Sequence, residues 1–365
     1  MKLRPLDTPF LLVVCGLIVF GLLIFTSAAL GLLARDGATF TSVAVNQLLL
    51  GFLLGGIGLI ITSRIDYKLW RPYTPYIFGF AIVLTLLTFV PHIGLELKGA
   101  SRWLNLGPVS FQPVEFLKLA MVGFLAAVYA GNYRKIDTIV GGVVPLLAIA
   151  GGSAFIVLLQ PDTASGMMLT LAGAAMFFAA GGRMLHMVLL ALIGIVFVAG
   201  AAFAYPHVRD RLVIYLDQSQ DPHGSGYQIT QSLIAVGSGG WTGRGFGQSI
   251  EKFSYLPEPI GDSIFAVAAE EFGFVGSVLL VALYAAFAIL ALRIAARAPD
   301  PFGGLLVVGL TALIVGQSFF NMASAVALVP LVGVPLIFVS HGGTALAIAL
   351  IEVGILLSVS RRMKT

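Results

Sequence analysis

Long apolar runs divide the chain, and they restrict its fold more than any other feature of the sequence. An α-helix needs about 20 apolar residues to cross the hydrocarbon core of a bilayer. We therefore expect an all-α integral membrane protein of about ten transmembrane helices, with residues 1–365 forming one membrane domain. The candidate spans are Phe10–Leu33, Val43–Ile61, Tyr73–Val90, Val114–Tyr129, Ile139–Leu159, Thr163–Ala180, Met184–Tyr205, Ser263–Leu292, Phe302–Leu328 and Val334–Val359.

Charged residues are too scarce for a water-facing surface. Asp, Glu, Lys and Arg make up 10% of the chain, against about 25% in soluble domains. The net charge of +4 raises the question of nucleic-acid binding. The basic residues, however, sit in short clusters between apolar runs, so we expect a membrane partner and no nucleic acid.

The placement of basic residues decides between nine and ten spans, because only Gln160-Pro161-Asp162 separates the fifth run from the sixth. Ten spans with the N-terminus inside place thirteen basic residues on the cytoplasmic side and seven outside, as the positive-inside rule requires. Nine spans would move the clusters at Arg183, Arg293 and Arg361 to the wrong side. The sequence thus predicts two cytoplasmic termini and a long outer loop, residues 206–262.

Two ionisable residues lie near the start of the fourth span. Glu115 and Lys118 are three positions apart, so a helix places them on one face, close enough to pair. Ionisable groups at membrane depth are costly and indicate function by default. A structural ion pair and a role in catalysis both remain open.

Other acidic residues have structural interpretations. Asp162 follows Pro161 and would cap the sixth helix, and Asp262 would cap the eighth. We expect Glu270, Glu271 and Glu352 to face the protein interior in structural roles.

No motif for a nucleotide or a metal stands out. The Gly-rich stretch from Gly237 to Gly247 lacks the Walker lysine pattern, so it is interpreted as a tightly turned outer loop in which Arg244 and free amides would meet an anion. The five histidines show no metal-ligand spacing, and Cys15 is the single cysteine.

Several segments, taken together and in order, resemble the SEDS family, whose members include FtsW, RodA and SpoVE. A tyrosine is usual in that family where His341 stands, and Ser101 replaces a commonly basic residue. The matching segments are Gly99 to Leu104, Gln112 to Lys118, Gln160 to Asp162, Gln231 to Gly240, Gly243 to Ser249, Tyr255 to Glu258, Asp262 to Ala266, Glu270-Glu271, Asn321 to Pro330, Gly333, Pro335 and Ser340 to Gly343.

The resemblance implies a peptidoglycan glycosyltransferase that polymerises lipid II at the outer face of the bacterial cytoplasmic membrane. It implies a class B penicillin-binding protein, the transpeptidase, as partner, and a divalent cation, Mg²⁺ or Mn²⁺, with no organic cofactor. Asp262 becomes the expected general base. The other expected site residues are Glu115 and Lys118 in catalysis and Arg102, Asp162, Arg244 and Gln112 in substrate binding, with metal ligands unknown.

Two alternatives stay open. A lipid II flippase would use Glu115, Lys118 and Asp162 as a polar path, although transport predicts internal repeats that we do not see. A scaffold for the division or elongation complex would leave the buried charges unexplained. The sequence does not separate a division protein from an elongation protein.

Overall fold

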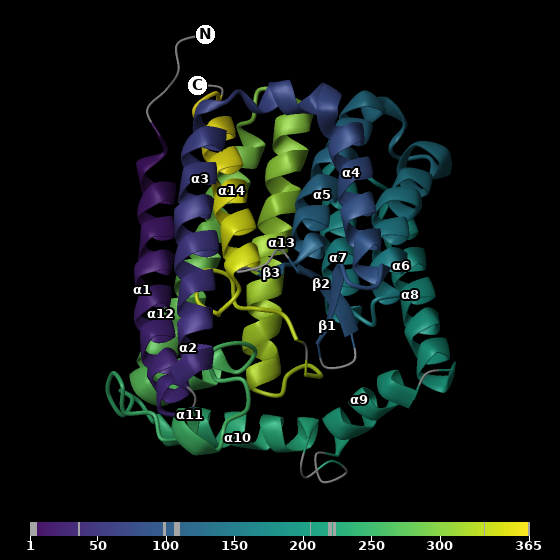
Figure 1. Ribbon diagram of the computed structural model, residues 1–365. Coiled ribbons are helices and arrows are strands. Elements are labelled where there is room, and N and C mark those ends of the chain that lie inside the picture. Colours follow the sequence, from purple (N-terminus) through teal and green to yellow (C-terminus); the bar gives the residue numbers. More distant parts are fainter. Residues whose placement is uncertain are drawn as a thin grey trace.

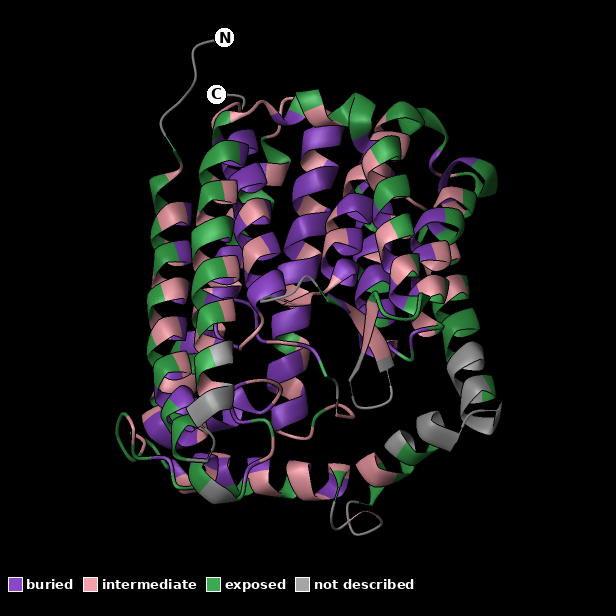
Figure 2. Cartoon of the chain, in the orientation of Figure 1, coloured by how far each residue is buried: buried purple, intermediate pink, exposed green. Residues whose placement is uncertain are grey.

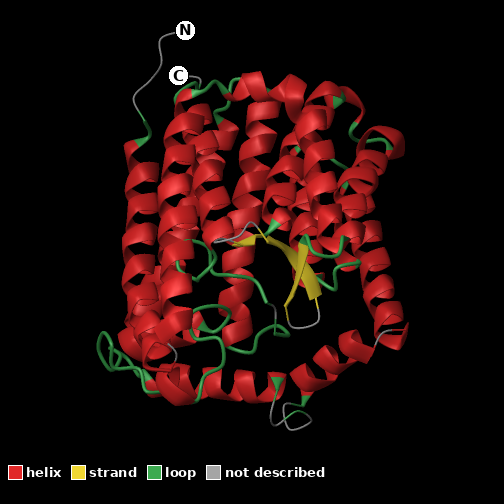
Figure 3. Cartoon of the chain, in the orientation of Figure 1, coloured by secondary structure: helices red, strands yellow, loops and turns green. Residues whose placement is uncertain are grey.

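The computed structural model describes residues 6–35, 37–97, 100–105, 110–204, 206–217, 221, 224–331 and 333–363. Helices run side by side through the bundle, and a small strand element sits against them (Figure 1, Figure 3). The first half contains α1 (Thr8–Arg35), α2 (Gly37–Val45), the π-helix η1 (Asn46–Leu54), α3 (Gly55–Arg64), the 3₁₀-helix η2 (Tyr67–Tyr73), α4 (Thr74–Leu86), the 3₁₀-helix η3 (Leu87–Phe89), β1 (Gly94–Leu97), β2 (Ala100–Asn105), β3 (Ser110–Phe111), α5 (Pro113–Gly131), the 3₁₀-helix η4 (Tyr133–Lys135), the π-helices η5 (Ile139–Val143) and η6 (Leu146–Gly151), and α6 (Gly152–Leu158). The second half contains α7 (Thr163–Ala179), α8 (Met184–Ala204), α9 (Pro206–Leu216), α10 (Ser225–Ser238), α11 (Glu251–Ser254), α12 (Ile264–Ala296), α13 (Pro301–Ala325) and α14 (Gly343–Ser360).

The described residues contain eight helical stretches that are long and apolar enough to cross a membrane. Two shorter apolar helices, Thr163–Ala179 and Met184–Ile195, bring the total to the ten spans expected from the sequence. The break at Gln160 to Asp162 does separate two helices, α6 and α7. Four basic residues used in the charge count lie outside the described residues: Lys2, Arg4, Lys98 and Lys364.

The start of α1 and the end of α14 lie at the same end of the bundle, and α9 to α11 lie at the opposite end (Figure 1). An even number of spans produces this arrangement. That the end with both termini faces the cytoplasm stays a prediction.

Helices α13 and α14 form the centre of the bundle (Figure 2). In α14, 89% of the most apolar stretch is buried, against 33% in α1, whose outer face is exposed. Small residues allow close helix approach in membranes. At Gly309 of α13 an added Cβ would lie 2.5 Å from Val122 of α5 and 2.6 Å from Met176 of α7. This glycine therefore lets α13 contact two helices at once.

The two connections expected on the outer side are more structured than expected. The segment predicted as one long loop, residues 206–262, contains α9, α10 and α11. The connection between α4 and α5 forms an antiparallel sheet of order β1-β2-β3.

The predicted tenth span was wrong at its start, because α14 begins at Gly343 and residues 333–342 are irregular. Phe338 has a φ of 71°, which no α-helix accommodates. Side-chain bonds replace helical ones: Gln47 of η1 accepts from the backbone N–H of Gly342 at 3.0 Å and donates to the carbonyl of Ser340 at 3.3 Å. The predicted ninth span also ran too long, since α13 ends at Ala325.

Candidate functional site

Asp262 lies in the connection just before α12, and its backbone is fixed from other elements. The side-chain amide of Asn321, on α13, donates to the carbonyl of Asp262 at 3.1 Å. The hydroxyl of Ser340 donates to the carbonyl of Gly261 at 2.9 Å. The backbone N–H of His341 donates to the carbonyl of Ile260 at 2.7 Å. From α10, Gln228 donates to the hydroxyl of Ser263 at 3.0 Å. The carboxylate is thus carried by a segment with little freedom to shift.

The interpretation of Asp262 as a helix cap was wrong. Helix α12 begins at Ile264, and the capping position is held by Ser263, whose side chain makes no capping hydrogen bond. The Asp262 carboxylate is partly exposed and faces the irregular segment before α14: a Cβ added at Gly333 would lie 3.4 Å from its Oδ2.

Glu115 and Lys118 form an ion pair inside the bundle. The Lys118 ammonium lies 2.7 Å from Glu115 Oε1 and donates to Gln317 Oε1 at 2.8 Å, and both charged side chains are buried. Glu352 of α14 lines the same internal cavity of about 10 Å³, the space of one water molecule. Two carboxyl groups and one ammonium therefore line one buried site, and the expected interior position of Glu352 is confirmed.

Helix α13 connects the ion pair to Asp262. Gln317, which accepts from Lys118, donates to the carbonyl of Pro335 at 3.4 Å. Asn321, which donates to Asp262, also donates to the carbonyl of Val334 at 2.8 Å. The irregular segment before α14 is therefore bonded both to the buried charges and to the connection that carries Asp262.

Arg102 and Asp162 lie together at the break between α6 and α7. The Arg102 guanidinium donates to the carbonyl of Gln160 at 3.1 Å and to the carbonyl of Pro161. Asp162 accepts from the backbone N–H of Ser165 at 3.1 Å, so its interpretation as the cap of α7 is confirmed. Buried Gln160 donates to Thr88 at 2.6 Å and ties the break to η3.

Gln112 occupies the capping position of α5 without a side-chain capping bond. Its backbone N–H donates to the hydroxyl of Thr344, at the start of α14, at 3.3 Å. The structure thus brings the starts of α5 and α14 together.

The Gly-rich stretch is a tight turn, as expected, and it forms hydrogen bonds with the backbone of α12 where that helix is interrupted. Gly240, Gly243, Gly245 and Gly247 all have positive φ. Gly273 interrupts α12 with φ 66° and ψ −163°, a conformation that only glycine adopts readily.

Loop groups replace the helical hydrogen bonds that this break removes. The amides of Phe274 and Val275 donate to the carbonyls of Gly240 and Trp241, at 2.9 and 3.1 Å. The freed carbonyls of Glu270 and Glu271 accept from the amides of the loop at 3.0 and 2.9 Å. Arg244 also pairs with Glu270, at 3.4 Å, while its side chain stays 38% exposed. Its expected contact with a substrate anion stays a prediction.

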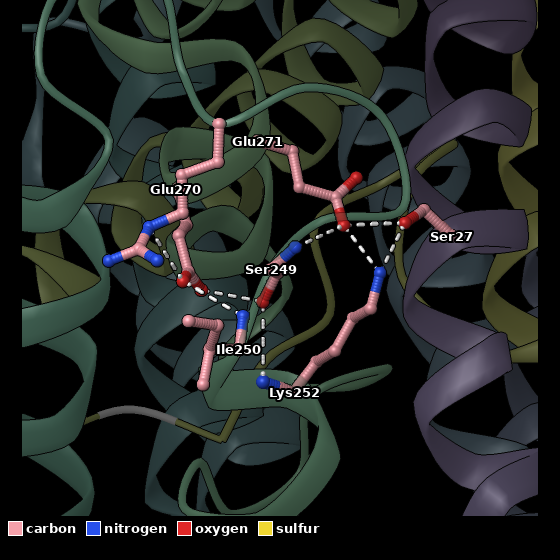
Figure 4. Close-up of polar contacts among 7 residues, drawn as sticks. Ser27, Ser249, Ile250, Lys252, Glu270 and Glu271 are labelled. Atoms are coloured by element: carbon pink, nitrogen blue, oxygen red, sulfur yellow. Dashed lines mark hydrogen bonds and ion pairs between the residues drawn. The ribbon is translucent and has the colours of Figure 1, made fainter.

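Glu270 and Glu271 are fully buried, as expected, and both carboxylates bind the residues around α11 (Figure 4). The sequence analysis missed three polar residues that surround Asp262, namely Asn321, Ser340 and Gln228. An available signal was the pair Gln317 and Asn321, two amides one helical turn apart in an apolar span. In the part of the chain that the structure describes, no three His, Cys, Asp or Glu side chains gather as metal ligands.

Comparisons with known proteins identify the family of this chain. A family model named for FtsW, RodA and SpoVE, and described as cell cycle protein, matches residues 8–365. The stage V sporulation protein E of Bacillus subtilis is 39% identical over 312 residues, covering 85% of each chain. The probable peptidoglycan glycosyltransferase FtsW of Trichlorobacter lovleyi is 34% identical over 366 residues, covering 100% of this chain and 95% of that protein.

Solved structures show the same fold. One, from work on the coordination of polymerization and crosslinking by a peptidoglycan synthase complex, is 27% identical, with a TM-score of 0.80 and coverage of 98% of both chains. The rod shape determining protein RodA of Thermus thermophilus is 25% identical, with a TM-score of 0.65 and coverage of 96% of this chain and 97% of that one. The chain therefore belongs to the FtsW/RodA/SpoVE family of multi-pass membrane proteins.

Proposed function

We propose that this protein is a peptidoglycan glycosyltransferase that polymerises lipid II into glycan strands for cell division or elongation. Relatives along the whole chain carry the name of that activity. The observation that carries the proposal is Asp262, a partly exposed carboxylate on a segment bonded to α10, α13 and the residues before α14. A general base must be held in place to act.

In the proposed reaction, Asp262 takes the proton from the 4-hydroxyl of one sugar unit. That oxygen bonds to the anomeric carbon of the other unit as the bond from this carbon to the lipid pyrophosphate breaks. Positive charge must then stabilise the leaving pyrophosphate. Arg102 and Arg244, both at least partly exposed, are the proposed contacts for it. Gln112 stays a proposed contact for the sugars, and buried Asp162, which caps α7, receives no contact with the pyrophosphate.

Lys118 and Glu115 receive a positioning role in place of direct chemistry. Lys118 is 2% exposed, and its ammonium already binds Glu115 and Gln317. Through Gln317 the pair would hold the segment at Pro335 that faces Asp262.

A divalent cation, Mg²⁺ or Mn²⁺, would accompany the substrate. The described residues supply no cluster of three acidic or histidine ligands, but Mg²⁺ is commonly held by phosphate oxygens, waters and one or two carboxylates. The bound ion would neutralise charge on the pyrophosphate. We assign it no further protein ligand.

The proposed partner is a class B penicillin-binding protein, and the proposed location is the bacterial cytoplasmic membrane with both termini in the cytoplasm. A relative of the same fold was solved in the context of a peptidoglycan synthase complex. The lipid II flippase and the scaffold are rival proposals, but neither needs an immobilised carboxylate at Asp262.

Polymerisation of labelled lipid II by the purified protein with Mg²⁺ and its partner tests the proposal. We expect glycan ladders from the wild type and none from a folded Asp262→Asn variant. Ladders from the variant would remove Asp262 as the base. Absence of polymer from the wild type with a competent partner would leave the flippase or the scaffold.

A further inference from the structure

Lys252 and Glu271 form a fully buried ion pair beside Glu270, the residue that pairs with Arg244 (Figure 4). The ammonium lies 2.5 Å from Glu271 Oε1, and the two side chains are 0% and 1% exposed. Ser27 of α1 joins them: its hydroxyl donates to the same oxygen at 2.6 Å and accepts from the Lys252 ammonium at 2.7 Å. Lysine is almost never fully buried unless it is paired. These three residues, from α1, α11 and α12, are called the clasp below.

Further bonds hold α11 against α12 beside the clasp. The hydroxyl of Ser249 donates to Glu270 Oε2 at 2.5 Å, and the backbone N–H of Ile250 donates to Glu270 Oε1 at 2.9 Å. Helix α1 touches the backbone here, since a Cβ added at Gly31 would lie 2.6 Å from the Lys252 carbonyl oxygen. The clasp is therefore the charged part of a larger set of contacts among α1, α11 and α12.

The clasp closes the base of the loop that carries the proposed general base. Asp262 lies ten residues after Lys252 and nine before Glu271. The tip of this loop is bonded to α13 through Asn321 and to the segment before α14 through Ser340. Base and tip are thus held by different elements.

Stability alone is a poor account of such a pair. Well-packed apolar residues often stabilise a protein as well as a buried ion pair does, because burying two charges removes them from water. What an ion pair adds is a defined geometry between its partners.

We propose that Lys252 and Glu271, with Ser27, are positioning residues for the glycosyl transfer, because they fix the base of the loop and so the place of Asp262. This inference rests on the proposed function. The clasp contacts no substrate; it acts through the backbone of residues 253–270.

Kinetics of the purified protein with its partner, together with thermal unfolding, test the proposal. Lys252→Met and Glu271→Gln each leave one buried charge without its opposite charge, so both should unfold at lower temperature. The double variant removes both charges. We expect it to regain most of the lost stability while kcat for lipid II polymerisation stays at least tenfold below wild type and KM changes less than threefold.

Recovery of kcat along with stability in the double variant would overturn the proposal and reduce the clasp to a folding element. Glu271→Asp covers the case in which the double variant does not fold. It keeps the charge but withdraws the carboxylate by one methylene, so we expect a smaller fall in unfolding temperature than in Glu271→Gln, with a several-fold lower kcat. Wild-type kcat in Glu271→Asp would also contradict the proposal.

The matched control is the exposed ion pair of Asp137 and Arg183, 3.1 Å apart with side chains 49% and 62% exposed. Asp137→Asn/Arg183→Gln should leave kcat unchanged. A lower kcat in this control would show that removing any ion pair slows the enzyme, and would count against the clasp.

Hydrogen exchange provides a readout that does not depend on activity. The backbone amide of His341 donates to the carbonyl of Ile260 and so joins the segment before α14 to the loop. The backbone amide of Ser263 donates to the carbonyl of Glu258 within the loop. In the clasp double variant we expect both amides to exchange at least tenfold faster, while amides in the middle of α5 stay unchanged. Faster exchange with no polymerisation by the wild type would refute the proposed function alone. Unchanged exchange would refute the clasp alone.

Discussion

Gln317 and Asn321 lie one turn apart on α13, and each donates its side-chain amide to a carbonyl of the segment before α14. Gln317 reaches Pro335 and Asn321 reaches Val334. Gln317 also accepts from Lys118, whereas Asn321 also donates to Asp262. One face of one helix therefore connects the buried ion pair to the proposed general base.

Asn321→Ala should impair both stability and activity. The substitution leaves two carbonyls, of Asp262 and Val334, without their donor, and a buried unsatisfied polar group costs about 1–3 kcal/mol. We expect unfolding at lower temperature and a polymerisation rate at least tenfold lower. Ser324→Ala is the control, because that hydroxyl donates to the carbonyl of Asn321 within its own helix. Wild-type polymerisation by a folded Asn321→Ala protein would argue against the positioning of Asp262 by α13.

Lys118→Met should destabilise the protein strongly. It leaves the buried carboxylate of Glu115 without its cation, and breaking a buried pair costs about 3–5 kcal/mol. Unfolding by SDS titration measures the loss. Glu115→Gln/Lys118→Met should recover part of it, since the carboxylate that lost its cation is then removed as well. If the free energy of unfolding of Lys118→Met lies within about 1 kcal/mol of the wild-type value, the ion pair contributes no more than an exposed ion pair does.

Gly273→Ala should prevent the Gly-rich loop from docking on α12. The new Cβ would lie 2.3 Å from the backbone nitrogen of Gly243, and φ at this position is 66°. The strained backbone alone costs about 1–3 kcal/mol. We expect a lower unfolding temperature and more proteolysis within residues 239–247. Gly79→Ala, where nothing lies within 4 Å of the added Cβ, should behave as wild type.

The stability of the protein should fall at mildly acidic pH because of His341. Burial lowers the pKa of its imidazole, and the carboxylate of Glu258 opposes this. The imidazole takes up a proton at a pKa near 6.5 in the unfolded chain and only at lower pH in the folded protein. The contribution of His341 to the free energy of unfolding is therefore complete above pH 6.5 and is lost as the pH falls below it. Thermal unfolding from pH 8 to pH 5 measures the slope. His341→Tyr should flatten it, and an unchanged slope would assign the effect to other groups.

Removal of divalent cations should stop polymerisation. With the ligands coming mainly from the substrate pyrophosphate, EDTA should abolish glycan ladders, and Mg²⁺ or Mn²⁺ should restore them. The unfolding temperature of the protein without lipid II should not change with EDTA. A shift in that temperature would indicate a metal site in the protein itself.

The sequence alone determined the number of spans, their approximate ends and the i, i+3 pairing of Glu115 with Lys118. These features are local: the length of an apolar run, the sign of its flanking charges and the helical repeat can all be read along the chain. It also determined the tight turns at the glycines of residues 237–247 and the cap at Asp162, because both depend on neighbouring residues.

Only the tertiary structure decided the surroundings of Asp262, the break at Gly273 and the pairing of Lys252 with Glu271. Asn321 lies 59 residues from Asp262 along the chain, and Ser27 lies 244 residues from Glu271. Such contacts depend on how helices pack, and helix packing depends on where small residues such as Gly309 allow close approach. The start of α14 was predicted wrongly for the same reason. Residues 334–342 are apolar enough to be counted as the first part of a span. Hydrogen bonds to Asn321, Gln317 and Gln47 nevertheless hold them in an irregular path.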